Sequence, residues 1–374
     1  MKLTQKYFSP LRLCSSLFLL IFLCQNLWVI TARAETLVPL YVNKGTSLIH
    51  IARKYCNKQS DWHSIAKTNH LKEPYSIRAK QTLQIPIDLL RTKDVSAQVA
   101  SVNGAPKLVT EDSRILELHK GDSVLPGQTV VTSENEYVHL LYPDNKHTRI
   151  GPQSEMTLTY LMRLTDDSLQ AEFSLKKGRI IHSVNKKLKA NEHFNTRTPI
   201  AITGIRGTEF RIKAEDSETN IVETLRGAVA LSAAGERVLL NKGKGSKVKK
   251  GAPPEPPRNL PPKPDLPEFK DVYRTLPVVI TAPAHKTAKA IRLRMAADQK
   301  GQTTLFEELK EPGKDFTLFS LTDGKYYAFL TAIDDKDFES LPSSPNLIYI
   351  RTIPAAPLIS KSFIASSKPA PRYE

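Results

Sequence analysis

The feature that most constrains the fold is a long stretch in which short apolar runs alternate with turn residues. It extends over residues 95–251 and shows no helical periodicity. Residues 137–142 precede a Pro-Asp-Asn turn, and residues 221–225 precede Arg226 and Gly227. Runs of this kind, bounded by Gly, Asp and Asn, are typical of β-strands. We therefore predict an all-β domain over residues 95–251.

Helical spacing is confined to residues 35–90. Thr46 is placed to cap a first helix, whose apolar positions are expected to be Leu48, Ile49, Ala52 and Tyr55. Asp61 caps a second helix that carries Trp62, Ile65 and Ala66 on one face and ends near Asn69. Strand-like pieces flank the pair at residues 37–42 and 82–86. The order predicts a small α+β unit, strand–helix–helix–strand.

The residues of this unit form a motif with defined order and spacing. They are Tyr41-Val42-x-x-Gly45-Thr46-Ser47-Leu48-x-x-Ile51-Ala52, then Ile65-Ala66-x-x-Asn69, then Ile77-x-x-x-Gln81-x-Leu83-x-Ile85-Pro86. This pattern resembles the lysin motif (LysM). The resemblance implies binding of glycans that contain N-acetylglucosamine, such as peptidoglycan. The family usually has Asp after the glycine, where this chain has Thr46.

Two loops at one end of the motif are the expected glycan site. A sugar needs backbone hydrogen-bonding groups for its acetamido substituents and apolar surface for its ring faces. The candidate glycan-binding residues are Gly45, Thr46, Ser47, Leu48, Asn69, His70, Leu71, Pro74, Tyr75 and Ile77. Two alternatives stay open: Leu48 and Ile77 could belong to the core, and Asn69 could be only a helix cap. Trp62 is expected in the core.

The β-rich stretch also carries a family pattern. Its parts are Leu118-x-x-Gly121-Asp122, Gly127-Gln128-x-Val130-x-Thr132, Gly178-x-Ile180, Thr198-Pro199, Arg206-Gly207-Thr208-Glu209-Phe210 and Leu225-Arg226-Gly227-x-Val229. They resemble the FecR-type domain, known as the periplasmic part of iron-siderophore signal transducers and as a wider envelope module. The transducers carry a membrane helix before this domain. This chain has the LysM-like unit there.

The segment after the β-rich domain divides the chain. Residues 253–267 contain eight prolines, which predicts an extended, semi-rigid linker over residues 252–270. The lysine-rich run just before it, residues 242–250, is either a solvated linker face or a site for anionic polymers. Strand-like runs over residues 271–353 resemble a fibronectin-III or immunoglobulin-like β-sandwich. Residues 354–374 are expected to be disordered.

The first 34 residues predict export. Lys2, Lys6 and Arg12 precede an apolar run, and Ala32-Arg33-Ala34 places small residues before a cleavage point, as in a signal peptide. A membrane anchor is the alternative, but polar residues interrupt the apolar stretch. Cleavage would leave Cys56 as the last cysteine, without a disulfide partner. The expected location is the periplasm or cell envelope, with no membrane span after cleavage.

The formal net charge of +16 is basic, and an exported chain would meet envelope polyanions rather than nucleic acid. No metal-ligand spacing, paired carboxylates or activated cysteine is evident, so we expect no catalytic residue, metal or cofactor. The favoured function is non-catalytic peptidoglycan binding, with the FecR-like domain contacting an unknown envelope protein. Signalling from an outer-membrane receptor is the alternative, and a wall-remodelling enzyme is a third.

Overall fold

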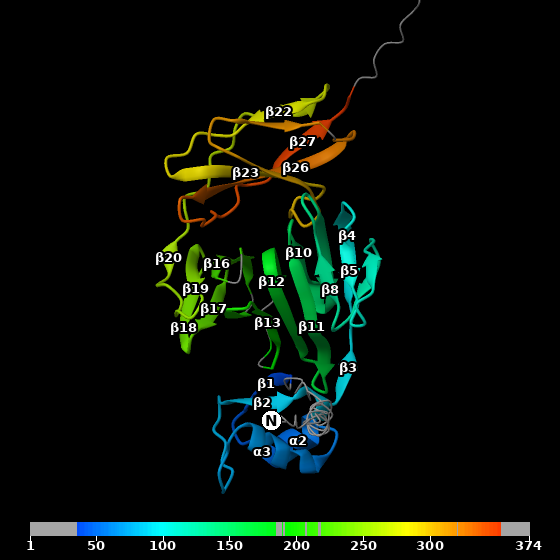
Figure 1. Ribbon diagram of the computed structural model, residues 1–374, viewed down its shortest axis with the longest axis vertical. Helices are drawn as coiled ribbons and strands as arrows, with labels where there is room; N and C mark the ends of the chain where they lie inside the picture. The colour runs from blue at the N-terminus through cyan, green and yellow to red at the C-terminus, as the bar shows by residue number, and fades with distance from the viewer. Residues whose placement is uncertain are drawn as a thin grey trace, which may run out of the picture.

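The computed structural model describes residues 36–184, 189, 191–205, 208–215, 218–319 and 321–352. The predicted signal peptide and the predicted disordered tail lie outside these residues. Three units follow one another along the long axis of the molecule (Figure 1). Strands dominate, and helices occur chiefly in the N-terminal unit. Within the described part of the chain, no helix has the length and apolar character needed to span a membrane.

The N-terminal unit has the predicted order of elements. Strand β1 pairs antiparallel with β2, from Leu37 opposite Pro86 to Tyr41 opposite Thr82, and two helices lie between them in sequence. The bounds are β1 (Leu37–Tyr41), α2 (Leu48–Tyr55), η1 (Gln59–Asp61), α3 (Trp62–Thr68), β2 (Thr82–Pro86) and η2 (Ile87–Leu89). The α+β prediction for this region is confirmed.

Two details of the first helix differ from the prediction. Ser47, not Thr46, is the N-cap, because its Oγ accepts a hydrogen bond from the backbone N–H of His50 at 3.3 Å. The helix therefore begins at Leu48, and Leu48, Ala52 and Tyr55 are buried as predicted. Ile51 is buried, whereas Ile49, expected on the apolar face, is 43% exposed.

The central unit is a closed barrel. Along β11 and β17, buried residues alternate with partly buried ones, as expected for strands with one face toward the core. The strands are β3 (Thr92–Asp94), β4 (Ala97–Asn103), β5 (Lys107–Val109), β6 (Ile115–Glu117), β7 (Ser123–Val124), β8 (Thr129–Val131), β9 (Tyr137–Tyr142), β10 (Lys146–Ile150), β11 (Glu155–Leu164), β12 (Leu169–Val184), β13 (His193–Arg197), β14 (Ile202–Ile205), β15 (Glu209–Ala214), β16 (Thr219–Arg226), β17 (Ala228–Ala233), β18 (Glu236–Asn241), β19 (Lys244–Lys249) and β20 (Arg258–Asn259), with the turn η3 (Pro143–Asn145).

The long strand β12 connects the two halves of the barrel. Its first half pairs with β11 and β13, and its second half pairs with β10 and β15. Gly178 lies where the strand changes sheets, with φ of +98°. A Cβ there would lie 2.4 Å from the Cα of Ser154, so only glycine fits. The Gly178-x-Ile180 pattern of the sequence thus marks a bend required by the fold.

The C-terminal unit consists of two sheets. One has the strand order β21-β27-β26-β23-β24, and the other pairs β22 with β25. Leu293, Phe316 and Leu330 belong to a core that the two sheets share. The strands are β21 (Val272–Tyr273), β22 (Val278–Thr281), β23 (Ala288–Ala296), β24 (Thr304–Lys310), β25 (Asp315–Leu318), β26 (Gly324–Asp334) and β27 (Asn346–Ile350). The fibronectin-III or immunoglobulin-like identity of this region stays a prediction.

The segment predicted as a linker contacts the units on both sides of it. Its strand β20 pairs with β19, and Leu260 packs with Ile221 of the barrel and Phe338 of the C-terminal unit. Most of the preceding lysine-rich run lies in β19, with Val248 fully buried. That run is therefore part of the barrel and not a linker face, because residues 245–249 pair with β16 and Gly245, Ser246 and Val248 are buried.

The N-terminal unit and the barrel share a core. Tyr160, Met162 and Leu164 of β11 are buried among N-terminal residues such as Tyr55 and Leu90. The connecting strand β3 pairs with the same end of β11. Apolar surface of the barrel therefore completes the N-terminal unit.

Candidate functional site

The structure brings the two predicted loops to the same end of the N-terminal sheet. Val42 donates its backbone N–H to the carbonyl oxygen of Gln81 at 2.9 Å, and Lys80 donates to the carbonyl oxygen of Val42 at 2.8 Å. These bonds join the β1–α2 loop, residues 42–47, to the α3–β2 loop, residues 69–81. Residues far apart in sequence thus form one continuous surface.

The α3–β2 loop presents apolar surface next to backbone in the left-handed region. His70 and Tyr75 have φ of 52° and 54°. His70 and Pro74 are exposed, whereas Leu71, Tyr75 and Ile77 are half-buried against the N-terminal core. The Tyr75 ring meets Trp62 edge-on, with ring centroids 5.5 Å apart. Trp62 supports this loop and is only partly buried.

Asn69 and Leu48 serve the fold. The Asn69 amide donates to the carbonyl oxygens of Ile65 at 2.8 Å and Gln84 at 2.7 Å, and its oxygen accepts from the N–H of Gln84 at 2.8 Å. Both amide hydrogens are thereby used. Leu48 is 5% exposed and packs in the core. These roles match the alternatives stated for Leu48 and Asn69, and we leave both residues out of the proposed glycan contacts.

A pocket of about 360 Å³ lies beside the β1–α2 loop. Of the predicted site residues, Gly45 and Thr46 line it, while Ser47 is exposed at the helix start. The prediction did not include the helix face that completes the pocket. Its polar and charged members are His50, Arg53 and Lys54. Their spacing of three and four residues, which places side chains on one helix face, was the signal available in the sequence.

Tyr55 lies in the same pocket and links it to the barrel. Its hydroxyl donates to Asp166 at 2.8 Å and accepts from the Asn191 amide at 2.9 Å. Burial and the nearby Asp166 raise the pKa of Tyr55, so the phenol stays neutral. Burial opposes ionisation of Asp166, but hydrogen bonds from Ser168, Tyr55 and Asn191 outweigh it and lower its pKa to about 2. The carboxylate is therefore charged at neutral pH.

The described residues contain no group of three or more His, Cys, Asp and Glu side chains arranged to hold a metal ion. The Cys56 thiol is buried at the end of α2, and burial raises its pKa to about 11. The thiol is therefore protonated at neutral pH and is a weak nucleophile.

Comparison with known families identifies two of the units. Residues 41–86 match the LysM domain family. Residues 128–230 match the family described as FecR protein. We call these parts the LysM domain and the FecR-like barrel from here on. Arg206 and Gly207 of the FecR-like motif lie outside the described residues. No curated protein matches the chain.

Solved structures resemble the chain only distantly. Two structures of a candidate anti-sigma factor from Parabacteroides distasonis are 17% and 19% identical, with TM-scores of 0.30 and 0.29. Each match covers 35% of this chain and 59% of that protein. The extracellular domain of a candidate hybrid two-component system from B. thetaiotaomicron is 12% identical, with a TM-score of 0.16, over 60% of this chain and 36% of its own.

Proposed function

We propose that this chain is an exported, non-catalytic protein of the cell envelope that binds peptidoglycan through its LysM domain. The observation that carries the proposal is the LysM match over residues 41–86, combined with two loops that meet on one surface. Export by residues 1–34 and a location in the periplasm or envelope belong to the same proposal. N-terminal sequencing of the mature protein tests cleavage after Ala34.

The two sides of the domain suit different parts of the polymer. The α3–β2 loop offers Pro74 and Tyr75 as apolar surface for pyranose rings. The face of α2 with His50, Arg53 and Lys54 offers positive charge to the carboxylates of peptidoglycan. Binding at the loop is expected to persist in high salt, whereas the contribution of the α2 face is expected to be screened.

Co-sedimentation with purified sacculi tests the proposal on the full mature chain. We expect wild type to pellet with sacculi, Tyr75→Ala to lower the bound fraction at every salt concentration, and Arg53→Gln to lower it only at low salt. Arg237→Gln is the control, because it removes the same charge from an exposed barrel residue on β18, outside the LysM domain. A thermal melt of each variant checks folding. Wild type that stays in the supernatant contradicts the proposal.

The FecR match favours a second candidate function, envelope signalling through a contact with an outer-membrane receptor. In the first proposal the same barrel is a protein-interaction module of unassigned partner. Both are tested by capture from outer-membrane extract on the full chain. The barrel alone is a poor bait because removal of the LysM domain would expose Tyr160, Met162 and Leu164. Recovery of a receptor supports signalling, and recovery of another envelope protein supports the scaffold role.

A further inference from the structure

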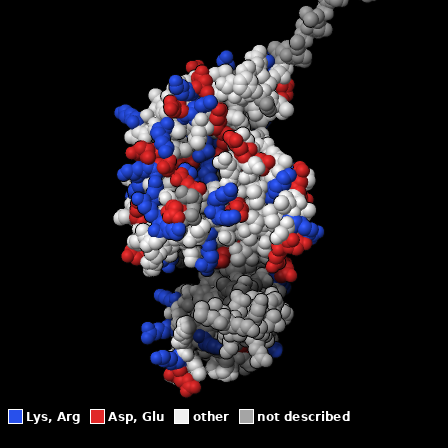
Figure 2. Space-filling view, in the orientation of Figure 1, with Lys and Arg blue, Asp and Glu red and all other residues white. Residues whose placement is uncertain are grey.

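Charged side chains are concentrated where the barrel meets the C-terminal unit. Figure 2 shows Lys and Arg gathering on the side of the molecule over β18, β19 and β20. Within the junction, a cleft is lined by five arginines, which come from β10, β12, β15 and β23: Arg149, Arg179, Arg211, Arg292 and Arg294. We call this space the junction cleft.

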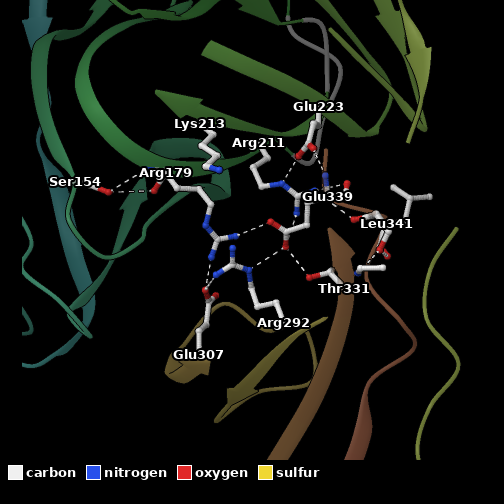
Figure 3. A network of polar contacts seen from close by, with 12 residues as sticks. Ser154, Arg179, Arg211, Lys213, Glu223, Arg292, Glu307, Thr331, Glu339 and Leu341 are labelled. Atoms are coloured by element: carbon white, nitrogen blue, oxygen red, sulfur yellow. Dashed lines mark hydrogen bonds and ion pairs between the residues drawn. The ribbon is translucent and has the colours of Figure 1, made fainter. Parts of the chain in front are cut away.

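Three of these arginines are matched by carboxylates. Glu339 pairs with Arg211 and Arg292, each at 3.2 Å, and with Arg179 at 3.5 Å (Figure 3). Glu307 pairs with Arg179 and with Arg292, the latter at 3.3 Å. Glu223 pairs with Arg211. This part of the network holds the two units together, and its charges are satisfied.

Arg294 is not matched in this way. No ion pair within 4.0 Å joins its guanidinium to a described carboxylate, and Glu307, its partner across β23 and β24, acts on it from a longer distance. The guanidinium lies over the Phe329 ring, 4.6 Å from the centroid. Its Nε atom is buried and has no hydrogen-bond partner. Burial and the charge of Arg149 lower the pKa of Arg294 to about 9. A buried donor without an acceptor is costly, so an added acceptor at this position would be favourable.

Arg149 is also poorly compensated. Its closest carboxylate oxygen is that of Glu209, at 3.5 Å, and it donates to the backbone oxygen of Gly301. Burial lowers its pKa. Lys300 lies at the exposed side of the same cleft. Glu209 and Glu307 both act on the charges of Arg149 and Arg294, but Glu307 is already paired with Arg179 and Arg292. Arg149, Arg294 and Lys300 therefore carry more positive charge than these two carboxylates balance.

The junction cleft has room for a small molecule. Its volume is about 290 Å³, and an adjoining cavity of about 570 Å³ shares Arg149, Ile181, Glu209 and Lys300 with it. Ligand sites in proteins usually measure about 300–1,000 Å³ and combine apolar walls with a few convergent polar groups. Here Ile181 and Phe329 supply apolar wall beside the unmatched cations.

We propose that the junction cleft is a binding site for a small organic anion, whose carboxylate or phosphate group is held by Arg294 and Arg149, with Lys300 at the entrance. Guanidinium groups present parallel N–H donors that match both oxyanions. The carbon part of the ligand lies against Ile181 and Phe329. This site is independent of the LysM domain and of glycan binding.

A structural role for Arg294 predicts a different outcome from a binding role. A structural arginine contributes to stability, so its loss lowers the melting temperature of the free protein. A binding arginine without a partner does not, because its removal relieves a buried, unmatched charge. The Arg294→Gln variant is therefore expected to melt at or above the temperature of wild type when no anion is present.

Titration calorimetry on the full mature chain tests the site, with inorganic phosphate and succinate as separate probes at constant ionic strength. We expect saturable binding of one molecule of at least one probe, and the comparison assigns the site to phosphate or carboxylate. Arg294→Gln should weaken binding at least tenfold. Arg294→Lys keeps the charge but loses the planar guanidinium, so its affinity should lie between those of wild type and Arg294→Gln. Arg237→Gln should bind within twofold of wild type.

Three results would each overturn the proposal: no saturable binding of either probe to wild type, equal binding by Arg294→Gln and wild type, or a lower melting temperature of Arg294→Gln in anion-free buffer. The last result would make Arg294 part of the docking network. The glycan proposal would survive any of them, because sacculus binding is measured separately.

Discussion

Among single residues, His182 shows most clearly how the barrel core constrains chemistry. It is fully buried and hydrogen-bonded to the hydroxyls of Thr148 at 2.7 Å and Thr196 at 2.8 Å. Phe173 and Phe210 pack against its ring. The sequence predicted that the histidines are solvated or core residues rather than metal ligands. It could not single out His182, because its two partners come from other strands.

Acidification is expected to destabilise the barrel through His182. Burial lowers its pKa from 6.5 to about 3, so between these values the unfolded chain binds a proton that the folded chain does not. Stability therefore falls as the pH decreases from about 6.5 towards 3, by about 3 kcal/mol at pH 4 from this residue. His182→Gln should reduce, but not abolish, the pH dependence of urea unfolding, because burial also lowers the pKa values of His139 and His193 to about 4. The surface variant His119→Gln should leave the profile unchanged, and equally steep profiles for His182→Gln and wild type would contradict the assignment.

At the scale of elements, helix α2 shows what the sequence can and cannot predict. Its existence and three of its four apolar positions follow from local spacing, but its N-cap is one residue later than predicted, because Ser47 accepts the N–H of His50. Its docking depends on contacts between Tyr55 and residues 111 and 136 positions away. No pattern of neighbouring residues predicts such pairs. The β-strands could be predicted from the sequence, because short apolar runs between turn residues are a local pattern.

Removal of the Tyr55 hydroxyl tests the docking of α2 on the barrel. Tyr55→Phe loses the hydrogen bonds to the charged Asp166 and to Asn191, although Asp166 keeps those from Ser168 and Asn191. We expect a loss of about 2 kcal/mol in the free energy of unfolding, measured with urea. Tyr75→Phe is the matched control, because its hydroxyl contacts only the exposed Glu73 at 3.2 Å. Equal losses in the two variants would show that the Tyr55 contacts do not stabilise the docked arrangement.

At the scale of the whole molecule, the ion pairs of Arg179 and Arg211 with Glu307 and Glu339 join the barrel to the C-terminal unit. The proline-rich segment had suggested two independent units. Arg211 donates to the backbone oxygen of Glu339, 128 residues further along the chain. Composition predicted the extended backbone of residues 252–270, and its prolines do limit it to the short strand β20. The packing of Leu260 and the ion pairs beside it arise only when the units meet, so one sequence could not reveal them.

Neutralising Glu339 is expected to loosen the C-terminal unit. Glu339→Gln would leave buried arginines short of their shared carboxylate, at a cost of about 3–5 kcal/mol. The measurement is the rate of tryptic cleavage within residues 252–270, together with the free energy of unfolding. Asp112→Asn, which breaks the exposed pair with Arg114, should change stability by less than about 1 kcal/mol. Equal cleavage of Glu339→Gln and wild type would contradict a docking role.

The length of strand β12 limits the distance between the LysM domain and the junction cleft. The strand starts at Leu169, three residues after the Asp166 that holds Tyr55, and reaches Arg179 of the junction cleft ten residues later. At about 3.3 Å per residue, the barrel separates these points by at most about 33 Å. Because the LysM domain shares its core with β11 and the C-terminal unit is joined through ion pairs, neither end swings freely. A chain fixed to the wall by one end would therefore hold its cleft at a constant height above the glycan strand.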